Sequence, residues 1–194
     1  MGRKICDLCA RCENSLIFTK TKIDGPYTID VEKITDSRGF FARAWDKNIF
    51  EKTGLNQNLV QCNISFNKKR GTIRGMHYQK QPYQEAKLIR CTKGSAYEVM
   101  IDLRENSKTY MQWESVELHS DEHKMLYVPE GFALGFQTLE DNTELFYQMS
   151  QFFMPEFSRG IKWDDESFRI SWPLEITMIS EKDGSYEPFT PKTR

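Results

Sequence analysis

Residues 95–103, SAYEVMIDL, decide the fold class, because side chains of different character alternate along them. Tyr97, Val99 and Ile101 fall on one face of an extended chain, and Glu98 falls on the other. In a β-strand, successive side chains point to opposite faces of the sheet, so this alternation predicts a strand rather than a helix.

Similar short runs lie on both sides of this segment, and turns rich in Gly, Pro, Asp and Asn separate them. Short strands at roughly 8–12-residue spacing are typical of a β-sandwich or a jelly-roll barrel. Helix is scarce: Asp46–Thr53, ended by Gly54, is the best candidate, and the segment after Pro155 has room for a turn or two. The sequence therefore predicts an all-β jelly roll with few short helices. The further strand candidates are residues 17–22, 27–34, 59–65, 87–91, 113–118, 125–128, 133–139 and 144–150.

Length and composition indicate one globular domain of 194 residues, of which 39% are hydrophobic. The chain has 27 Lys and Arg residues against 28 Asp and Glu residues, a balance that argues against binding to nucleic acid or to a membrane surface. No run approaches the ~18 apolar residues of a membrane span, and the N-terminus lacks the apolar stretch of a signal peptide. We expect a cytoplasmic protein.

The first dozen residues hold three cysteines with the spacing C-x-x-C-x-x-C, namely Cys6, Cys9 and Cys12. Thiolates at this spacing suit a metal clip, but a tetrahedral site needs four ligands and no histidine is near in sequence. Reduced thiols on a poorly ordered tail are the alternative that we prefer. We expect residues 1–15 to form this tail and residues 16–194 to form the barrel, with the polar stretch 180–194 wrapping over its surface.

His77 stands apart from the other two histidines, because it lies in a glycine-flanked strand rather than in a polar turn. With its neighbouring glycines and a downstream Pro-x-Gly, it resembles the first motif of the cupin superfamily of jelly-roll barrels. Metal-binding cupins place further histidines where this chain has Gln79 and Leu134, so too few ligands remain for a catalytic metal. The resemblance predicts a metal-free cupin-type barrel in which His77 is free to act as a base. The matching positions are Gly71, His77, Glu85, Gly94 and residues 129–131.

Nine segments, in collinear order from about residue 16 to the end, resemble the dTDP-4-dehydrorhamnose 3,5-epimerase family. This resemblance implies an isomerase that inverts carbons 3 and 5 of a 4-keto-6-deoxyhexose attached to a nucleotide diphosphate, in deoxysugar or surface-polysaccharide synthesis. It also implies that no redox cofactor takes part. The segments are DSRGFF (36–41), GTIRGMHYQ (71–79), KLIRCTKG (87–94), VMIDLR (99–104), VPEGFALGFQTL (128–139), LFYQMSQFFMPE (145–156), RGIKWDD (159–165), SWP (171–173) and SEKD (180–183).

Four residues match the catalytic set of this family. Each proton to be removed lies next to the keto group, so the reaction needs a base, a group that stabilises the enolate oxygen, and an acid on the opposite face. The resemblance assigns His77 as the base and Asp183 as the carboxylate that pairs with it. It assigns Lys87 to the enolate oxygen and Tyr147 as the acid.

Other matches concern the nucleotide sugar. Arg38 and Arg74 resemble arginines that meet the diphosphate, for which a guanidinium offers several fixed donors. Gln61 and Asn63 resemble polar residues that line the pocket, and Phe41 resembles an aromatic residue near the nucleotide. In the family, the segment around Arg38 and Phe41 is exchanged between subunits, so the resemblance implies a homodimer with strand exchange.

Several positions depart from the family pattern. Leu134 stands where a histidine is usual, Phe152 and Phe153 replace paired tyrosines, and Arg43 stands where a glutamate is frequent. Glu98 replaces the usual aspartate that faces the pocket. The identity of the nucleotide and the number of carbons inverted therefore stay open. Two alternatives also stay open: a sugar ketoisomerase on the same fold, and a cupin that binds sugar nucleotides without turnover.

Overall fold

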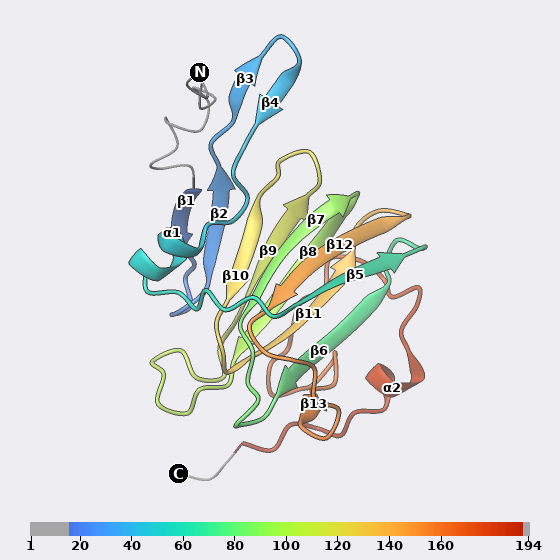
Figure 1. The fold of residues 1–194 in the computed structure, drawn as a ribbon. Coiled ribbons are helices and arrows are strands. Elements are labelled where there is room, and N and C mark those ends of the chain that lie inside the picture. Colours follow the sequence, from blue (N-terminus) through green and yellow to red (C-terminus); the bar gives the residue numbers. More distant parts are fainter. Residues whose placement is uncertain (1–15, 192–194) are drawn as a thin grey trace.

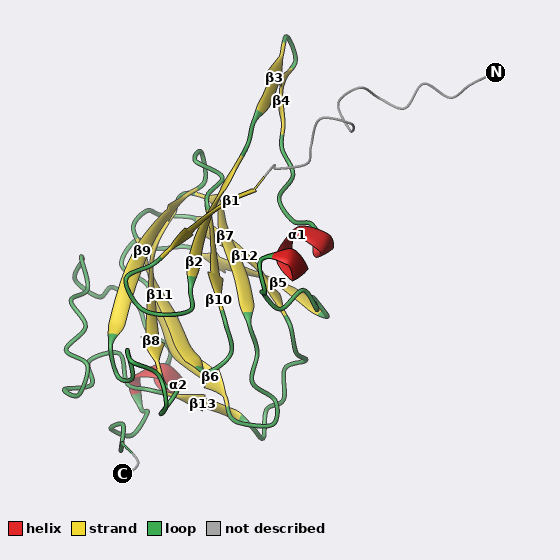
Figure 2. Cartoon of the chain, turned by 90° about the vertical axis from the view of Figure 1, so that its left-hand side faces the viewer, coloured by secondary structure: helices red, strands yellow, loops and turns green. Residues whose placement is uncertain are grey.

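Two antiparallel β-sheets pack face to face in the computed structural model, which describes residues 16–191 (Figures 1 and 2). The first sheet has six strands in the order β1 (Leu16–Lys20), β2 (Tyr27–Val31), β10 (Met125–Val128), β7 (Lys87–Lys93), β12 (Thr143–Met149) and β5 (Gln61–Asn67). The second has five in the order β13 (Ser158–Gly160), β6 (Ile73–Gln79), β11 (Phe132–Thr138), β8 (Ser95–Asp102) and β9 (Trp113–His119). This two-sheet arrangement confirms the predicted all-β jelly roll.

The alternating strand β8 lies between β11 and β9 and has buried side chains on both of its faces. Met100 points between the sheets and packs with Ile89 of β7 and Leu126 of β10. Val99 and Ile101 point the other way and pack in a second cluster with residues of the C-terminal segment. The alternation in the sequence therefore separates two buried faces rather than a buried face and a solvated one.

Helix α1 (Lys47–Lys52) confirms the helix predicted over Asp46–Thr53. The Asp46 carboxylate accepts hydrogen bonds from the backbone N–H groups of Asn48 and Ile49, which caps the first turn. Phe50 is fully buried and packs edge-on against Tyr127 of β10, with 5.9 Å between ring centroids. The helix thus covers the face of the six-stranded sheet that points away from the barrel interior.

The region after β2 differs from the sequence prediction. A single strand was expected over residues 27–34, but β2 ends at Val31 and the chain then forms a separate hairpin of β3 (Ile34–Asp36) and β4 (Gly39–Phe41). This hairpin projects beyond the two sheets (Figures 1 and 2). Phe40 and Phe41 remain about half exposed on it, although one side of the Phe40 ring packs against the His123 ring, with 5.0 Å between ring centroids.

The C-terminal stretch lies largely at the surface between residues 180 and 191, and most of its residues are exposed. It contains a short helix, α2 (Glu181–Gly184), whose Asp183 side chain is buried. The three clustered cysteines lie outside the described residues. Between residues 16 and 191 the structure has no helix with the length and apolar character needed to cross a membrane.

Candidate active site

His77 of β6 and Asp183 of α2 form a hydrogen-bonded pair, although 106 residues separate them in the chain. The His77 Nε2 and Asp183 Oδ1 atoms lie 2.8 Å apart. Asp183 is buried, while the His77 side chain keeps 39% of its surface exposed. A buried carboxylate at one ring nitrogen fixes the imidazole orientation and leaves the other nitrogen, Nδ1, for chemistry.

Local structure holds the carboxylate in place. Burial would raise the pKa of Asp183, but the hydrogen bond and charge of His77 and a further bond from the backbone N–H of Gly75 outweigh it, so this pKa is lowered. At the same time, the Ser180 hydroxyl accepts a hydrogen bond from the Asp183 backbone N–H, which caps α2. Asp183 is therefore held as an anion beside the histidine.

Gly75 allows β6 to approach β11 closely at this point. Its φ is +130°, and a Cβ atom there would lie 2.4 Å from the Cα atom of Gly135. Only glycine fits both the backbone conformation and the contact. The glycines that flank His77 in the sequence thus position its strand.

Lys87 begins β7 and faces the same region as His77. Its ammonium group lies 3.0 Å from Glu85 Oε1, and both side chains are largely buried. The predicted lysine therefore has a carboxylate partner two residues earlier in the chain. Glu85 was noted only as a cupin motif position, and its role beside Lys87 was not predicted.

Tyr147 lies in the middle of β12, between β7 and β5. Burial raises the pKa of its phenol, which the Arg74 guanidinium only partly offsets. The phenol is thus held in its protonated form at neutral pH, as a proton donor requires.

Two hollows of the barrel meet at His77, Lys87 and Tyr147, which line both of them. The first, of about 430 Å³, is called here the Glu98 cavity, and the second, of about 350 Å³, the Gln61 cavity. The three predicted catalytic side chains that line them come from three different strands. The Glu98 cavity is also lined by Arg74, Glu98, Leu134 and Phe136, and the Gln61 cavity by Gln61, Asn63, Phe153 and Lys182.

The predicted binding residues divide into two groups. Arg74, Gln61, Asn63 and Glu98 line the two cavities, as expected of residues that contact the ligand. The Arg74 Nε–H donates to Asn67 Oδ1 at 2.7 Å, which orients the guanidinium.

Arg38 and Phe41 lie elsewhere, on the projecting β3–β4 hairpin, and line neither cavity of their own chain. Arg38 forms an ion pair with Asp36 within that hairpin. The described chain therefore does not bring these two residues to the site.

Tyr186 is a contact that sequence reasoning missed. Its ring packs edge-on against the His77 imidazole, with 6.2 Å between ring centroids, and its buried hydroxyl has no hydrogen-bond partner among residues 16–191. Gly160 makes room for this ring, since a Cβ atom there would lie 2.0 Å from it. The only indication in the sequence that Tyr186 lies near His77 is its position three residues after Asp183.

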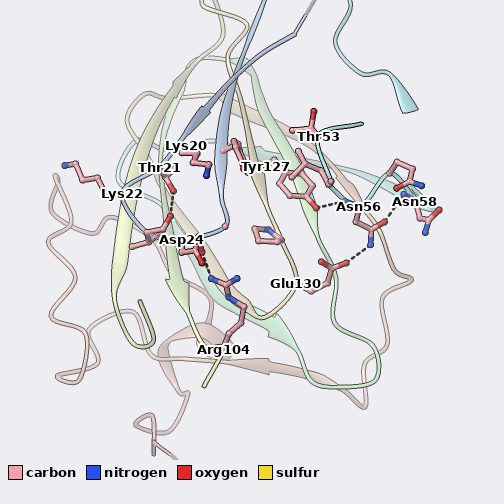
Figure 3. Close-up of a pocket in the computed structure, with 17 residues that line it drawn as sticks. Lys20, Thr21, Lys22, Asp24, Thr53, Asn56, Asn58, Arg104, Tyr127 and Glu130 are labelled. Atoms are coloured by element: carbon pink, nitrogen blue, oxygen red, sulfur yellow. Dashed lines mark hydrogen bonds between the residues drawn. The ribbon is translucent and has the colours of Figure 1, made fainter. Parts of the chain in front are cut away.

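A larger hollow of about 820 Å³ lies apart from these residues, where the β1–β2 turn meets the loop after α1 (Figure 3). Two of its charged groups are bonded to neighbours: Arg104 pairs with Asp102 and donates to the Asp24 carbonyl, and Glu130 Oε1 accepts from the Asn56 amide. The hollow includes none of the predicted site residues. Size alone does not make it the better candidate for chemistry.

Between residues 16 and 191, no group of three or more His, Cys, Asp and Glu side chains is placed to hold an ion. What the arrangement does provide is a base with a carboxylate partner, a cation, and a protonated phenol around one space. Such a set is suited to removing a proton from carbon and returning it.

Comparison with known proteins identifies close relatives of the chain. A family model described as dTDP-4-dehydrorhamnose 3,5-epimerase matches residues 20–190. The dTDP-4-dehydrorhamnose 3,5-epimerase of Methanothermobacter thermautotrophicus is 40% identical over 174 residues, which cover 88% of this chain and 93% of that protein.

Solved structures give the same result. The Bacillus anthracis dTDP-4-dehydrorhamnose 3,5-epimerase, with TDP and PPi bound, has a TM-score of 0.86 at 34% identity, covering 90% of this chain and 99% of that chain. The Legionella pneumophila dTDP-6-deoxy-D-glucose-3,5-epimerase, in complex with dTDP-4-keto-L-rhamnose, has a TM-score of 0.83 at 31% identity, covering 89% and 92%.

Proposed function

This chain belongs to the dTDP-4-dehydrorhamnose 3,5-epimerase family of isomerases, and we propose that it inverts carbon 3, carbon 5 or both of a 4-keto-6-deoxyhexose linked to a nucleotide diphosphate. The observation that carries the proposal is the meeting of His77, Lys87 and Tyr147 between two cavities, with Asp183 bonded to His77. The comparisons favour neither a ketoisomerase nor a cupin without turnover.

In the proposed reaction, His77 removes the proton from the carbon next to the keto group. Its Nε2–H donates to Asp183, so Nδ1 is the basic nitrogen, and the nearby carboxylate stabilises the imidazolium that forms. The electron pair of the broken C–H bond moves onto the keto oxygen, which produces an enolate. Inversion follows when a proton is delivered to the opposite face of the same carbon.

Lys87 and Tyr147 supply the other two requirements. We assign the Lys87 ammonium to the developing negative charge on the keto oxygen, because a fixed cation in a largely buried site stabilises such charge strongly. We assign Tyr147 as the acid that returns the proton, since burial keeps its phenol protonated. No step requires an electron acceptor, because the sugar is neither oxidised nor reduced overall.

The nucleotide diphosphate is the second part of the proposed substrate. Solved relatives contain TDP with PPi, or dTDP-4-keto-L-rhamnose, and this chain has Arg74, Gln61 and Asn63 along its two cavities. We propose that Arg74 meets the diphosphate and that Gln61 and Asn63 contact the rest of the ligand. Leu134 and Phe153 line these cavities without hydroxyl or imidazole groups, so we expect the sugar contacts to differ from those of the relatives.

We also propose that the protein is a homodimer in which the β3–β4 hairpin completes the partner's site. The hairpin projects from the barrel, and Phe40 and Phe41 are 47% and 46% exposed. Such apolar side chains on a short strand pair favour association with another chain. This assembly would bring Arg38 and Phe41 to a nucleotide. We place the enzyme in the cytoplasm, since the described thiols Cys62 and Cys91 are both free.

A solvent-exchange experiment tests the proposed function. The protein is incubated in deuterated water with dTDP- or CDP-linked 4-keto-6-deoxyglucose, and proton NMR follows the signals of the hydrogen atoms bound to carbons 3 and 5. We expect deuterium uptake with the wild-type protein and no uptake with His77→Ala, because the base is lost. His119→Ala, on the exposed end of β9, is the matched control and should exchange normally. Unchanged uptake in His77→Ala would overturn the assignment of the base.

A further inference from the structure

Glu98 is a buried carboxyl group whose oxygens have no hydrogen-bond partner in the described chain. It lies in the middle of β8, is 1% exposed, and lines the Glu98 cavity. Both oxygen atoms are shielded from solvent and unpaired. Buried polar groups are nearly always hydrogen-bonded, so this side chain is poised for a partner that the folded chain does not supply.

The nearest cation does not satisfy it. The Lys87 ammonium already forms an ion pair with Glu85 at 3.0 Å, and that pair is itself largely buried. If Glu98 were ionised as well, two carboxylates would share the Lys87 ammonium, and these three groups would carry a net charge of −1 beside the proposed enolate oxygen. The other cation that lines the cavity, Arg74, is bonded to Asn67 and is assigned above to the diphosphate. A net negative charge beside the enolate would oppose it rather than stabilise it.

The strands beside Glu98 do not offer a cation either. In the sheet, Glu98 is opposite Phe136 of β11 and Val116 of β9. Leu134, two residues before Phe136 and on the same face, also lines the cavity. The groups that face Glu98 from packed strands are Lys87 and Cys91 of β7, Tyr147 of β12, and Arg74 and His77 of β6.

From this placement we propose that Glu98 is a neutral carboxylic acid that donates a hydrogen bond to a hydroxyl or keto oxygen of the bound sugar. The proposal rests on the proposed function, and it adds the protonation state and the donor role of this residue. Burial raises the pKa of Glu98 to about 8, and the Lys87 charge offsets this only in part. A proton on Glu98 leaves the Glu85–Lys87 pair neutral overall and keeps the positive end of that pair available to the enolate.

Binding measurements across pH test the donor role. The probe is dTDP-glucose, and TDP without a sugar is the reference, both measured by calorimetry at pH 7 and pH 9. We expect wild-type affinity for dTDP-glucose, relative to TDP, to fall roughly tenfold over this interval, because the fraction of protein with a protonated Glu98 falls by that factor. In Glu98→Gln this sugar-dependent fall should disappear, because the amide cannot lose its proton. Each other titratable group is the same in both proteins.

Infrared spectroscopy of the ligand-free protein provides a second readout that does not depend on activity. Wild type at pH 7 should show the C=O stretch of a protonated carboxyl group that Glu98→Gln lacks. Absence of this band, or equal pH dependence of sugar binding in the two proteins, would overturn the proposal. If wild type does not bind dTDP-glucose at any pH, the proposed function is wrong, and so is the proposed contact between Glu98 and the sugar. The infrared band then still shows whether Glu98 carries a proton.

Discussion

The pH dependence of folding stability gives a separate consequence of a buried, protonated Glu98. The perturbation is Glu98→Gln, which keeps the size and shape of the side chain but removes its ability to ionise. Unfolding exposes Glu98 to water, where it regains its ordinary pKa of 4.5, compared with about 8 in the folded state. The folded protein therefore holds a proton on Glu98 that the unfolded chain releases above pH 4.5.

The sign and size of the effect follow from this difference. A raised folded-state pKa contributes stability that is fully present below pH 4.5 and is lost as the pH rises to about 8. Each unit of pKa difference corresponds to ~1.36 kcal/mol, so the whole change is about 5 kcal/mol. Folded domains are stable by only ~5–15 kcal/mol, which makes this a large share of the free energy of unfolding.

Urea unfolding at a series of pH values from 5 to 9 measures the change. Protein concentration is held fixed, and fluorescence of the four tryptophans follows the transition. The free energy of unfolding of wild type should fall relative to that of Glu98→Gln by about 1.4 kcal/mol per pH unit up to about pH 8. Above that pH the difference between the two proteins should level off. Glu166→Gln, at an exposed position, is the control and should follow the wild-type curve.

All other titratable groups are the same in the compared proteins, so their contributions cancel in the difference between the two free energies of unfolding. A difference between Glu98→Gln and wild type that stays constant over this range would refute the reasoning. It would mean that Glu98 ionises in the folded protein as readily as in water. The unpaired carboxyl would then have to find a compensating partner that the described chain lacks.

Two further predictions concern the His77 strand and its partner. Asp183→Asn keeps the shape of the side chain but removes the negative acceptor 2.8 Å from His77, so turnover measured by NMR should fall about 10²- to 10⁴-fold while TDP binding, measured by calorimetry, persists. Equal turnover would contradict the role given to the pair. Gly75→Ala should lower the free energy of unfolding by at least about 2 kcal/mol, because its Cβ would lie 2.4 Å from Gly135. Gly39 has a similar positive φ of +133°, but no atom lies within 4 Å of a Cβ added there. In urea unfolding, Gly39→Ala should therefore lower the free energy of unfolding by less than Gly75→Ala does. An equal loss in the two variants would show that backbone strain, rather than the contact with Gly135, causes the destabilisation.

Elements governed by local interactions were predictable from the sequence. The α1 helix begins at a capping aspartate and ends just before Gly54, and both signals lie within the segment itself. Strand β8 was predictable for the same reason, since alternation of side chains is a local pattern. The hairpin of β3 and β4 was not, because strands of three residues are too short for a period to appear.

Contacts between distant segments were not predictable from the residues alone. Asp183 lies in a polar stretch that local pattern assigns to the surface, and only the family resemblance linked it to His77. Tyr186 had no such guide and was missed. Alternation placed Glu98 on the opposite face from Val99, but it could not show that both carboxyl oxygens lack a partner, because that depends on what five other strands bring to the cavity.

The distribution of the site over the fold separates chemistry from recognition. His77, Lys87 and Tyr147 lie on three paired strands, β6, β7 and β12, whose positions the hydrogen-bond ladders fix. Arg38 and Phe41 lie instead on a hairpin that projects beyond the two sheets. In the proposed homodimer, a substitution in that hairpin would change what is bound without moving the groups that handle protons. The lining of the Glu98 cavity differs from the hairpin in this respect, because Leu134 and Glu98 share that cavity with Lys87 and with the expected sugar. A change there alters recognition and the electrostatics of the enolate together, so Glu98 is the position where the specificity of this chain and its rate are most closely coupled.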